Sequence, residues 1–459
     1  MKKVLVFISI SLLAFTGILC KKLSVDFDES KYDQRMSGGA ATVFLSNSQA
    51  FGSMIPGMSP WDSYIHAVGD KIFSQTFVTA PAPHFGGLGT LYNNVSCIRC
   101  HMNDGKGVPT SGSVNSGFLT KLSVPGLGLN GAPLEIPGFG SQLQDKAVSG
   151  KTPEAKVQIV YNDKMFTYPD GSKVILRKPD YAITNPYTIL PSDYMMSVRL
   201  GPPVFGVGLL ELIPEATILG FAEAQRADNK GIKGIPNYVW DEETKSIKMG
   251  RFGLKANNPT VLMQVAGAFH QDMGITSSLF PIDNSYGQPQ FDGMKDDPEI
   301  TDSILMATVF YVRTLAVPAR RDIEDPTVIK GERLFRQLNC SSCHIPETKT
   351  GVDVRLAQIS NQRIQPFTDL LLHDMGPDLA DGRPDFLASG QHWKTPALWG
   401  IGLLQRVNQT ASFYLHDGRA RTIEEAILWH GGEAERSRND FAQLNAADRK
   451  TLIRFLSSL

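Results

Sequence analysis

Four of the five cysteines stand in two identical patterns. Residues 97–101 read C-I-R-C-H and residues 340–344 read C-S-S-C-H. The pattern C-x-x-C-H is the attachment site of c-type haem. Two thiols at this spacing reach the two vinyl groups of one porphyrin, and the adjacent histidine places a ring nitrogen beneath the iron. Because composition alone predicts roughly 0.001 such motifs here, we expect two covalently bound haem c groups. The residues that would hold them are Cys97, Cys100, His101, Cys340, Cys343 and His344.

Paired cysteines have other uses, which fit this sequence less well. A thioredoxin-like redox pair has no need of a trailing histidine in both motifs. A zinc site requires the ligand pairs to form one tetrahedral set. A disulfide across a two-residue gap is strained. The repeated histidine therefore favours haem.

The first twenty residues resemble an export signal. Lys2 and Lys3 precede an apolar run at 4–19, which Cys20 follows, as in secretory signal peptides. The run is shorter than the ~20 residues that cross a bilayer, so a retained anchor is the less favoured alternative. Cys20 stands where a bacterial lipoprotein carries its lipidated cysteine, but Leu19 replaces the usual small residue, and a lipid anchor to the membrane stays open. We expect a periplasmic or outer-membrane-associated protein, since haem c is attached outside the inner membrane.

Composition sets the broad class. A length of 459 residues suggests two or three domains. Hydrophobic residues make up 42% and charged residues 20%, which is typical of globular proteins. Because Lys and Arg total 45 against 46 Asp and Glu, the chain lacks the basic excess of a nucleic-acid-binding protein.

An internal repeat follows the two haem motifs. Residues 201–211 (GPPVFGVGLLE) match 395–405 (TPALWGIGLLQ), and further on 250–252 (GRF) match 418–420 (GRA). A repeated block indicates two homologous units. We predict a signal peptide at 1–20, an N-terminal haem domain at 40–316 and a C-terminal cytochrome c-like haem domain at 327–459.

The pattern of apolar residues predicts a mainly α fold of two cytochrome c-like haem domains. The second domain ends in an amphipathic helix at 446–459. The first carries long loop and β-hairpin insertions, with short β-like runs at 156–161 and 173–176 and a hairpin at 238–249.

Further motifs carry a family resemblance. The second half, with KTPALWG at 394–400, YLHDG at 414–418 and TIEEAI at 422–427, resembles the bacterial di-haem cytochrome c peroxidase superfamily. Through QVAGAF at 264–269 and DMGITS at 272–277, the whole chain is most similar to its di-haem oxidoreductase group, described as peroxidases or thiol oxidoreductases. The thiol label has no support in the residues, because Cys20 is the only cysteine outside the haem motifs.

The resemblance implies a sixth ligand for the second haem. In the family this ligand lies eight positions after the threonine that begins the T-[LI]-E-[EQ] helix. Here Thr422 leads to His430, where the peroxidases have methionine and a related enzyme has tyrosine. Thr422 and Glu425 suit a capping box for that helix. A surface histidine is the alternative. A haem with two histidine ligands has a lower potential than one with histidine and methionine.

The first haem is the reactive one by resemblance, with a glutamine and an acid over it. The matching residues are Gln264 and, eight positions on, Asp272. Glu211 is the alternative acid. An acid–base group moves the proton to the leaving oxygen of peroxide, and an amide dipole stabilises developing charge. His270 and Met273 are alternatives of another kind, as ligands that would block this iron.

The remaining histidines carry no motif. We expect His66, His84, His373 and His392 to be loop or surface residues, with His84 the best placed as an extra ligand. Members of the superfamily also hold calcium between their domains, for which Thr395 is the matching contributor, although the sequence has no acidic calcium loop. A homodimer is common in the family.

The function that follows is reduction of hydrogen peroxide, or another small oxidant, at the first haem. Electrons would pass through the second haem from a small redox protein or cytochrome. One alternative is an electron-transfer cytochrome with both haems six-coordinate. Another is an enzyme that oxidises another protein, which His430 in place of tyrosine makes less favoured.

Overall fold

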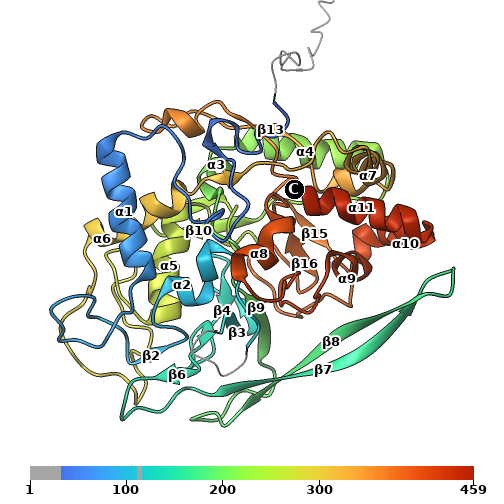
Figure 1. Ribbon diagram of the computed structural model, residues 1–459. Helices are drawn as coiled ribbons and strands as arrows, with labels where there is room; N and C mark the ends of the chain where they lie inside the picture. The colour runs from blue at the N-terminus through green and yellow to red at the C-terminus, as the bar shows by residue number, and fades with distance from the viewer. Residues whose placement is uncertain (1–32, 111–115) are drawn as a thin grey trace, which may run out of the picture. The chain divides into compact units, whose positions relative to one another are not determined.

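The computed structural model describes residues 33–110 and 116–459. The predicted signal at 1–20 and Cys20 lie outside these residues. The α-helices are α1 (Pro60–Ser74), α2 (Cys97–Cys100), α3 (Val207–Glu211), α4 (Glu215–Asp228), α5 (Val261–Met273), α6 (Asp302–Arg313), α7 (Pro326–Gln337), α8 (Leu404–Asn408), α9 (Ile423–Leu428), α10 (Glu435–Gln443) and α11 (Ala446–Ser458), shown in Figure 1. Short 3₁₀ helices include η4 (Cys340–Ser342) and η7 (Gly432–Ala434).

The strands are short except in the insertions. They are β1 (Thr42–Val43), β2 (Leu91–Tyr92), β3 (Phe118–Leu127), β4 (Pro133–Leu134), β5 (Gln142–Leu143), β6 (Lys146–Ala147), β7 (Lys156–Thr167), β8 (Lys173–Thr184), β9 (Met195–Leu200), β10 (Tyr238–Asp241), β11 (Ser246–Met249), β12 (Val317–Pro318), β13 (Thr348–Lys349), β14 (Arg363–Ile364), β15 (Leu372–Asp374) and β16 (His392–Lys394). The predicted hairpin at 238–249 is confirmed as β10 and β11, which pair antiparallel.

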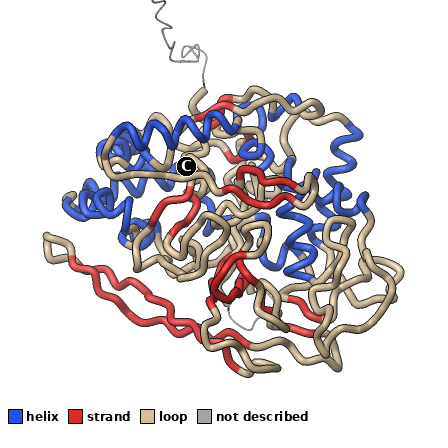
Figure 2. Tube along the Cα trace, turned by 180° about the vertical axis from the view of Figure 1, so that it is seen from behind, coloured by secondary structure: helices blue, strands red, loops and turns tan. Residues whose placement is uncertain are grey.

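The expectation of a mainly α fold is wrong. The chain is 30% helix and 19% strand. The strands are spread over many small sheets and are drawn in red in Figure 2. The reason lies in the insertions of the first half, for which the sequence predicts loops and β-hairpins and which also form a sheet of β3, β4, β5 and β9. Strand β3 pairs with β4 and β5 and, over a long sequence separation, with β9 from Phe118 opposite Leu200 to Ser123 opposite Met195.

The longest strands form a hairpin that contacts the C-terminal part of the chain. Strands β7 and β8 pair from Lys156 opposite Thr184 to Thr167 opposite Lys173, and the hairpin runs alongside helices α9 to α11 in Figure 1. Tyr181 Oη donates to an Asp417 oxygen at 2.7 Å. Near the turn, Tyr168 Oη donates to Glu424 at 2.7 Å. An insertion of the first half thus stabilises the second.

Helix starts follow their capping residues. Thr260 accepts from Met263 N at the start of α5, and Thr422 accepts from Glu425 N at 3.0 Å at the start of α9. The predicted capping box at Thr422 is half formed, because the Glu425 carboxylate accepts from Arg421 N rather than from Thr422 N. Each such cap stabilises its helix by about 1 kcal/mol.

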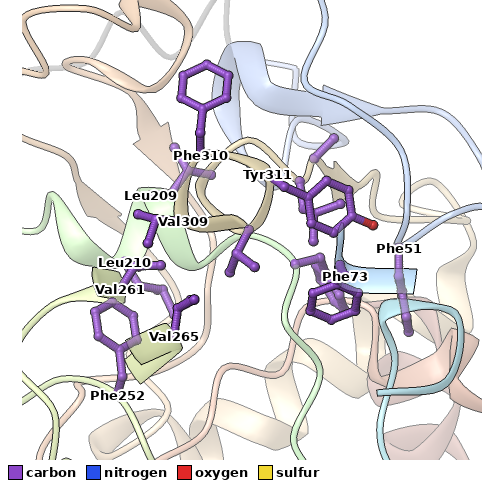
Figure 3. Packing of buried hydrophobic residues seen from close by; sticks show 14 of the residues in the cluster. Phe51, Phe73, Leu209, Leu210, Phe252, Val261, Val265, Val309, Phe310 and Tyr311 are labelled. Atoms are coloured by element: carbon purple, nitrogen blue, oxygen red, sulfur yellow. The ribbon is translucent and has the colours of Figure 1, made fainter. Parts of the chain in front are cut away.

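The larger hydrophobic core surrounds α6, which packs against α1 and α5 (Figure 3). Leu305, Val309 and Tyr311 on α6 are buried, and burying each such side chain contributes about 1.5–3 kcal/mol. A second cluster joins α7 and α11. Residues 35–459 form one compact unit, and the boundary between 316 and 327 stays a prediction.

Candidate haem sites

The first haem motif, residues 97–101, forms the single turn α2. His101 Nδ1 lies 2.7 Å from the carbonyl oxygen of Pro202. A carbonyl only accepts, so Nδ1 carries the hydrogen and Nε2 keeps a lone pair for iron. Burial, followed by the charge of Asp272, raises the pKa of Cys100 to about 12, so the thiol is neutral. These residues fit a haem group.

The second haem motif, residues 340–344, has the same arrangement. His344 Nδ1 lies 3.0 Å from Phe367 O, which again leaves Nε2 free. Burial, followed by the nearby His430, lowers the pKa of His344 to about 4, so the ring is neutral as a metal ligand must be.

His430 shares a cavity with this motif. Its Nδ1 lies 2.8 Å from Ala426 O, one turn back on α9, and burial lowers its pKa. His430 therefore also presents Nε2 without a hydrogen. His430 and His344 both line this cavity, so that His430 stays the predicted second axial ligand.

The cavity beside the second motif, here called the shared cavity, has a volume of about 340 Å³. Its lining is mostly apolar and comes from both halves of the chain. The second half contributes Cys340, Cys343, His344, Trp393, Trp399, His416 and His430. The first half contributes Lys106, Pro202, Phe205, Arg251 and Phe252. Pro202 also accepts the hydrogen bond from His101 Nδ1 through its carbonyl oxygen. The shared cavity is therefore lined by a residue that positions the histidine of the first motif.

Aromatic rings occupy the wall of the shared cavity. Trp393 stacks on His416 with ring centroids 3.8 Å apart and planes 11° apart. The Lys255 ammonium lies 4.6 Å from the Trp393 ring, in reach of a cation–π contact. Burial lowers the pKa of His416 to about 4. His416 is thus a neutral wall residue.

Gln264 and Asp272 both lie on α5. Eight residues of helix turn the second side chain about 80° from the first. Asp272 is partly buried and accepts from Gln142 Nε2 at 2.8 Å. Burial raises its pKa, against the opposing charge of Lys121. The backbone carbonyl of Asp272 accepts from Asn94 N at 3.0 Å, and Asn94 Nδ2 donates to Cys100 Sγ at 3.3 Å. Asp272 therefore lies near the first motif.

Glu211, the alternative acid, is hydrogen-bonded through both carboxylate oxygens. Its Oε1 accepts from Val261 N at 2.8 Å, at the first residue of α5, and its Oε2 pairs with Arg313 Nε at 2.6 Å. Both oxygens are engaged, so Glu211 fixes the start of α5. Near the start of the same helix, Gln264 Oε1 accepts from Asn258 Nδ2 at 3.0 Å.

The alternative ligands of the first haem are differently engaged. His270 Nε2 lies 2.8 Å from Ile282 O, and its ring stacks on Phe280 at 5.4 Å. Met273 is buried at the end of α5. His84 is exposed.

Two histidines expected in loops or at the surface are buried. His66 on α1 lies 2.7 Å from Thr314 Oγ1, and burial lowers its pKa to about 4. Its spacing from Gly69 and Phe73, also buried on α1, was a helical signal in the sequence. His373 is 2% exposed and lies between two carboxylates. No sequence pattern marks it, because Glu433 is sixty residues away.

Calcium binding between the two halves stays a prediction. Among the described residues one group of three potential metal ligands of the His, Cys, Asp or Glu type comes together, at Cys343, Asp369 and His373. The carbonyl oxygen of Thr395 accepts from Thr368 Oγ1 at 2.6 Å.

Comparison with known families identifies the family of this protein. The family described as "Di-haem oxidoreductase, putative peroxidase" matches residues 32–123 and 127–459. The chain belongs to this family. Membership in the di-haem oxidoreductase family makes haem the cofactor and oxidation–reduction the class of chemistry.

Other comparisons add little to the family assignment. No curated protein matches the sequence. A chain of the hydrazine synthase of Kuenenia stuttgartiensis is 19% identical over 34% of this chain and 55% of that chain, about half its length, with a TM-score of 0.24. A likeness this low carries no argument. Within residues 33–110 and 116–459, each helix is too short or too polar to span a bilayer.

Proposed function

We propose that this di-haem oxidoreductase is an exported c-type cytochrome that reduces hydrogen peroxide at the first haem, with electrons relayed through the second. Thioether bonds from Cys97, Cys100, Cys340 and Cys343 hold the two groups. The observation that carries the proposal is an asymmetry between the sites. His430 lies in the cavity of His344, whereas the helix beside the first motif offers Gln264 and Asp272 and ties the Nε2 of His270 to a backbone carbonyl.

The reaction consumes two electrons and two protons per peroxide and yields two water molecules. Haem, when bound, supplies the iron that binds one peroxide oxygen and delivers electrons to it. Asp272 holds a proton more readily than an ordinary aspartate, since burial raises its pKa. It donates this proton to the leaving oxygen, which departs as water. Gln142 fixes the orientation of the carboxyl group, and the Gln264 amide orients peroxide.

The shared cavity supports electron relay. Trp393 and Trp399 line it, and its first-half wall includes Pro202, the hydrogen-bond partner of His101. The cavity of the second motif thus extends to the residue that supports the first motif, as electron transfer between two haem groups of one chain would need. The donor is a small redox protein or cytochrome in the periplasm or at the outer membrane, and Cys20 anchors the chain if it is lipidated.

The test is electron paramagnetic resonance of the purified holo-protein, half-reduced and then exposed to peroxide. We expect a high-spin signal from the first haem that changes on adding peroxide, beside a low-spin signal from the second. Two low-spin signals that ignore peroxide in every redox state would contradict the proposal and leave an electron-transfer cytochrome.

Variants then assign the acid. Asp272→Asn should slow peroxide reduction by about 10²–10⁴-fold, the usual size of an acid–base contribution, with the second-haem signal unchanged. Asp163→Asn, an exposed carboxylate on β7, is the control and should keep full activity. If both variants reduce peroxide at the same rate, Asp272 is not the catalytic acid.

A further inference from the structure

His373 lies between two acids beside the second haem motif. Its Nε2 is 2.9 Å from Asp369 Oδ2 and its Nδ1 is 2.7 Å from Glu433 Oε2. A carboxylate accepts hydrogen bonds, and so each ring nitrogen must carry a hydrogen to satisfy both contacts. The geometry alone makes the ring an imidazolium. With 2% of its surface exposed, His373 is a buried cation.

Neighbouring groups hold the two acids in place. Asp369 Oδ2 also accepts from Gln225 Nε2 at 2.7 Å, and Asp369 Oδ1 accepts from Leu371 N at 2.9 Å. Glu433 Oε2 accepts from Lys233 N at 2.9 Å. A buried charge is stable only when it is paired and hydrogen-bonded in this way. The charge is therefore fixed in position.

The same network contacts the second haem motif at two points. Gln225 Nε2 donates to Ser342 O at 2.7 Å, between the two cysteines. His373 Nδ1 lies 3.6 Å from Cys343 Sγ. The imidazolium thus lies against the atom through which a haem group would be bound, and His373 lines the shared cavity.

Cys343, Asp369 and His373 are also spaced to hold a metal ion. Two features argue against that use. The Cys343 sulfur is committed to haem in a c-type motif, and a ring with a hydrogen on both nitrogens has no lone pair to give. The cluster is better understood as an electrostatic element.

We propose that His373 is a positioning residue whose fixed positive charge, balanced by Asp369 and Glu433, sets the reduction potential of the second haem. The inference rests on haem attachment at Cys340 and Cys343 in the proposed function, and it is independent of peroxide reduction. Although burial acts against it, the charge of Asp369 holds the pKa of His373 well above its usual value, in agreement with the geometry. Lys394, on β16 opposite β15, also faces Asp369.

The direction in which each substitution shifts the reduction potential follows from the charges. A positive charge near the iron favours the reduced haem, and a negative charge favours the oxidised one. The triad of His373, Asp369 and Glu433 carries a net charge of about −1 when the ring is protonated. His373→Gln makes it more negative and lowers the potential, whereas Glu433→Gln makes it less negative and raises the potential.

The experiment is a redox titration of the full holo-protein without peroxide, following the low-spin second haem. At a fixed potential, we expect His373→Gln to lower the ratio of reduced to oxidised second haem roughly tenfold, the effect of one charge about 10 Å away at an effective dielectric constant of about 20. A tenfold change for one electron corresponds to 59 mV. Glu433→Gln should shift the ratio by a similar factor in the opposite direction, and the double variant should return to the wild-type value.

His392→Gln is the matched control. This ring on β16 bonds Ser389 Oγ at 2.7 Å and should leave the potential unchanged. The proposal would be overturned if the ratio of reduced to oxidised second haem stays within threefold of the wild-type ratio in both His373→Gln and Glu433→Gln. It would also be overturned if the ratio changes in the same direction in both variants. If His373→Gln fails to fold, Glu433→Gln alone decides, because its potential must rise. Haem content is measured on each protein, and fewer than two haem groups per chain in the wild type would refute attachment at both motifs.

Discussion

Trp399 of the second repeat lies against Gly206 of the first. A Cβ at Gly206 would come within 2.6 Å of Trp399 Cζ2, and in the reverse contact a Cβ at Gly400 would come within 2.6 Å of Phe205 Cζ. Both glycines are left-handed, with φ of 72° and 71°. Each repeat therefore places its aromatic ring on the glycine of the other, and Phe205 and Trp399 both line the shared cavity.

This packing makes Gly206→Ala costly. A left-handed alanine costs about 1–2 kcal/mol, and displacing a buried ring costs about 1–3 kcal/mol more. We expect the free energy of unfolding, measured with denaturant, to fall by about 2–5 kcal/mol. Gly287 is the control, since it has φ of 82° and no atom within 4 Å of a built Cβ. Gly287→Ala should lower the free energy of unfolding only by the about 1–2 kcal/mol of a left-handed alanine. An equal loss of unfolding free energy in both variants would show that Trp399 does not constrain Gly206.

Two tyrosines of the β7–β8 hairpin should respond differently to loss of the hydroxyl group. Tyr181 Oη donates to Asp417, which is fully buried, so Tyr181→Phe should destabilise the protein by about 1.5–3 kcal/mol. Tyr161 Oη is buried with no hydrogen-bond partner among the described residues, so Tyr161→Phe should be neutral or stabilising. Denaturant unfolding of both variants is the measurement. Equal losses would mean that the hairpin does not dock through Tyr181.

The internal repeat could be read from sequence because it rests on local patterns. The P-x-hydrophobic-aromatic-G block predicts equivalent turns, and Gly206 and Gly400 have φ values within a degree of each other. Thr260 and Thr422 likewise cap their helices with nearly the same backbone angles. Short-range rules suffice for such features, since the residues that decide them are neighbours in the chain.

Features that depend on distant residues could not be predicted in this way. Pro125 and Gly126 near the end of β3 favour a loop, whereas residues 118–123 of the same strand pair with β9, some seventy to eighty residues on. The role of Glu211 depends on Arg313, and the charge of His373 depends on Glu433. The sequence marks the haem motifs clearly, whereas the residues that tune and position them become visible in three dimensions.

Replacing His430 tests the proposed second axial ligand. Because a thioether ligand raises the potential of haem relative to histidine, His430→Met should raise the potential of the second haem by on the order of 0.1 V, within the ~0.8 V that axial ligands span. His430→Ala should turn its low-spin signal high-spin. Redox titration and electron paramagnetic resonance measure the two effects. If both variants keep the wild-type potential and spin state, His430 is not a ligand.

The buried charge of His373 should also appear in the pH dependence of stability. Asp369 holds the pKa of His373 in the folded state well above its usual value despite burial, whereas an unfolded histidine titrates near pH 6.5. The contribution to stability is therefore complete below about pH 6.5, falls as the pH rises beyond it, and is gone above the folded-state pKa. Between these limits the folded state binds one more proton, so the free energy of unfolding should fall by up to about 1.4 kcal/mol per pH unit from this group.

His373→Gln removes that slope, and the difference in unfolding free energy between wild type and variant should shrink steadily as the pH rises from 7 to 9. His392→Gln is the comparison, because burial lowers the pKa of His392 and its contribution changes with the opposite sign below pH 6.5. Denaturant unfolding at each pH gives the three curves. A constant gap between wild type and His373→Gln over this range would mean that the folded and unfolded states bind the same number of protons above pH 7, so that His373 is neutral in the folded protein and is not a buried cation.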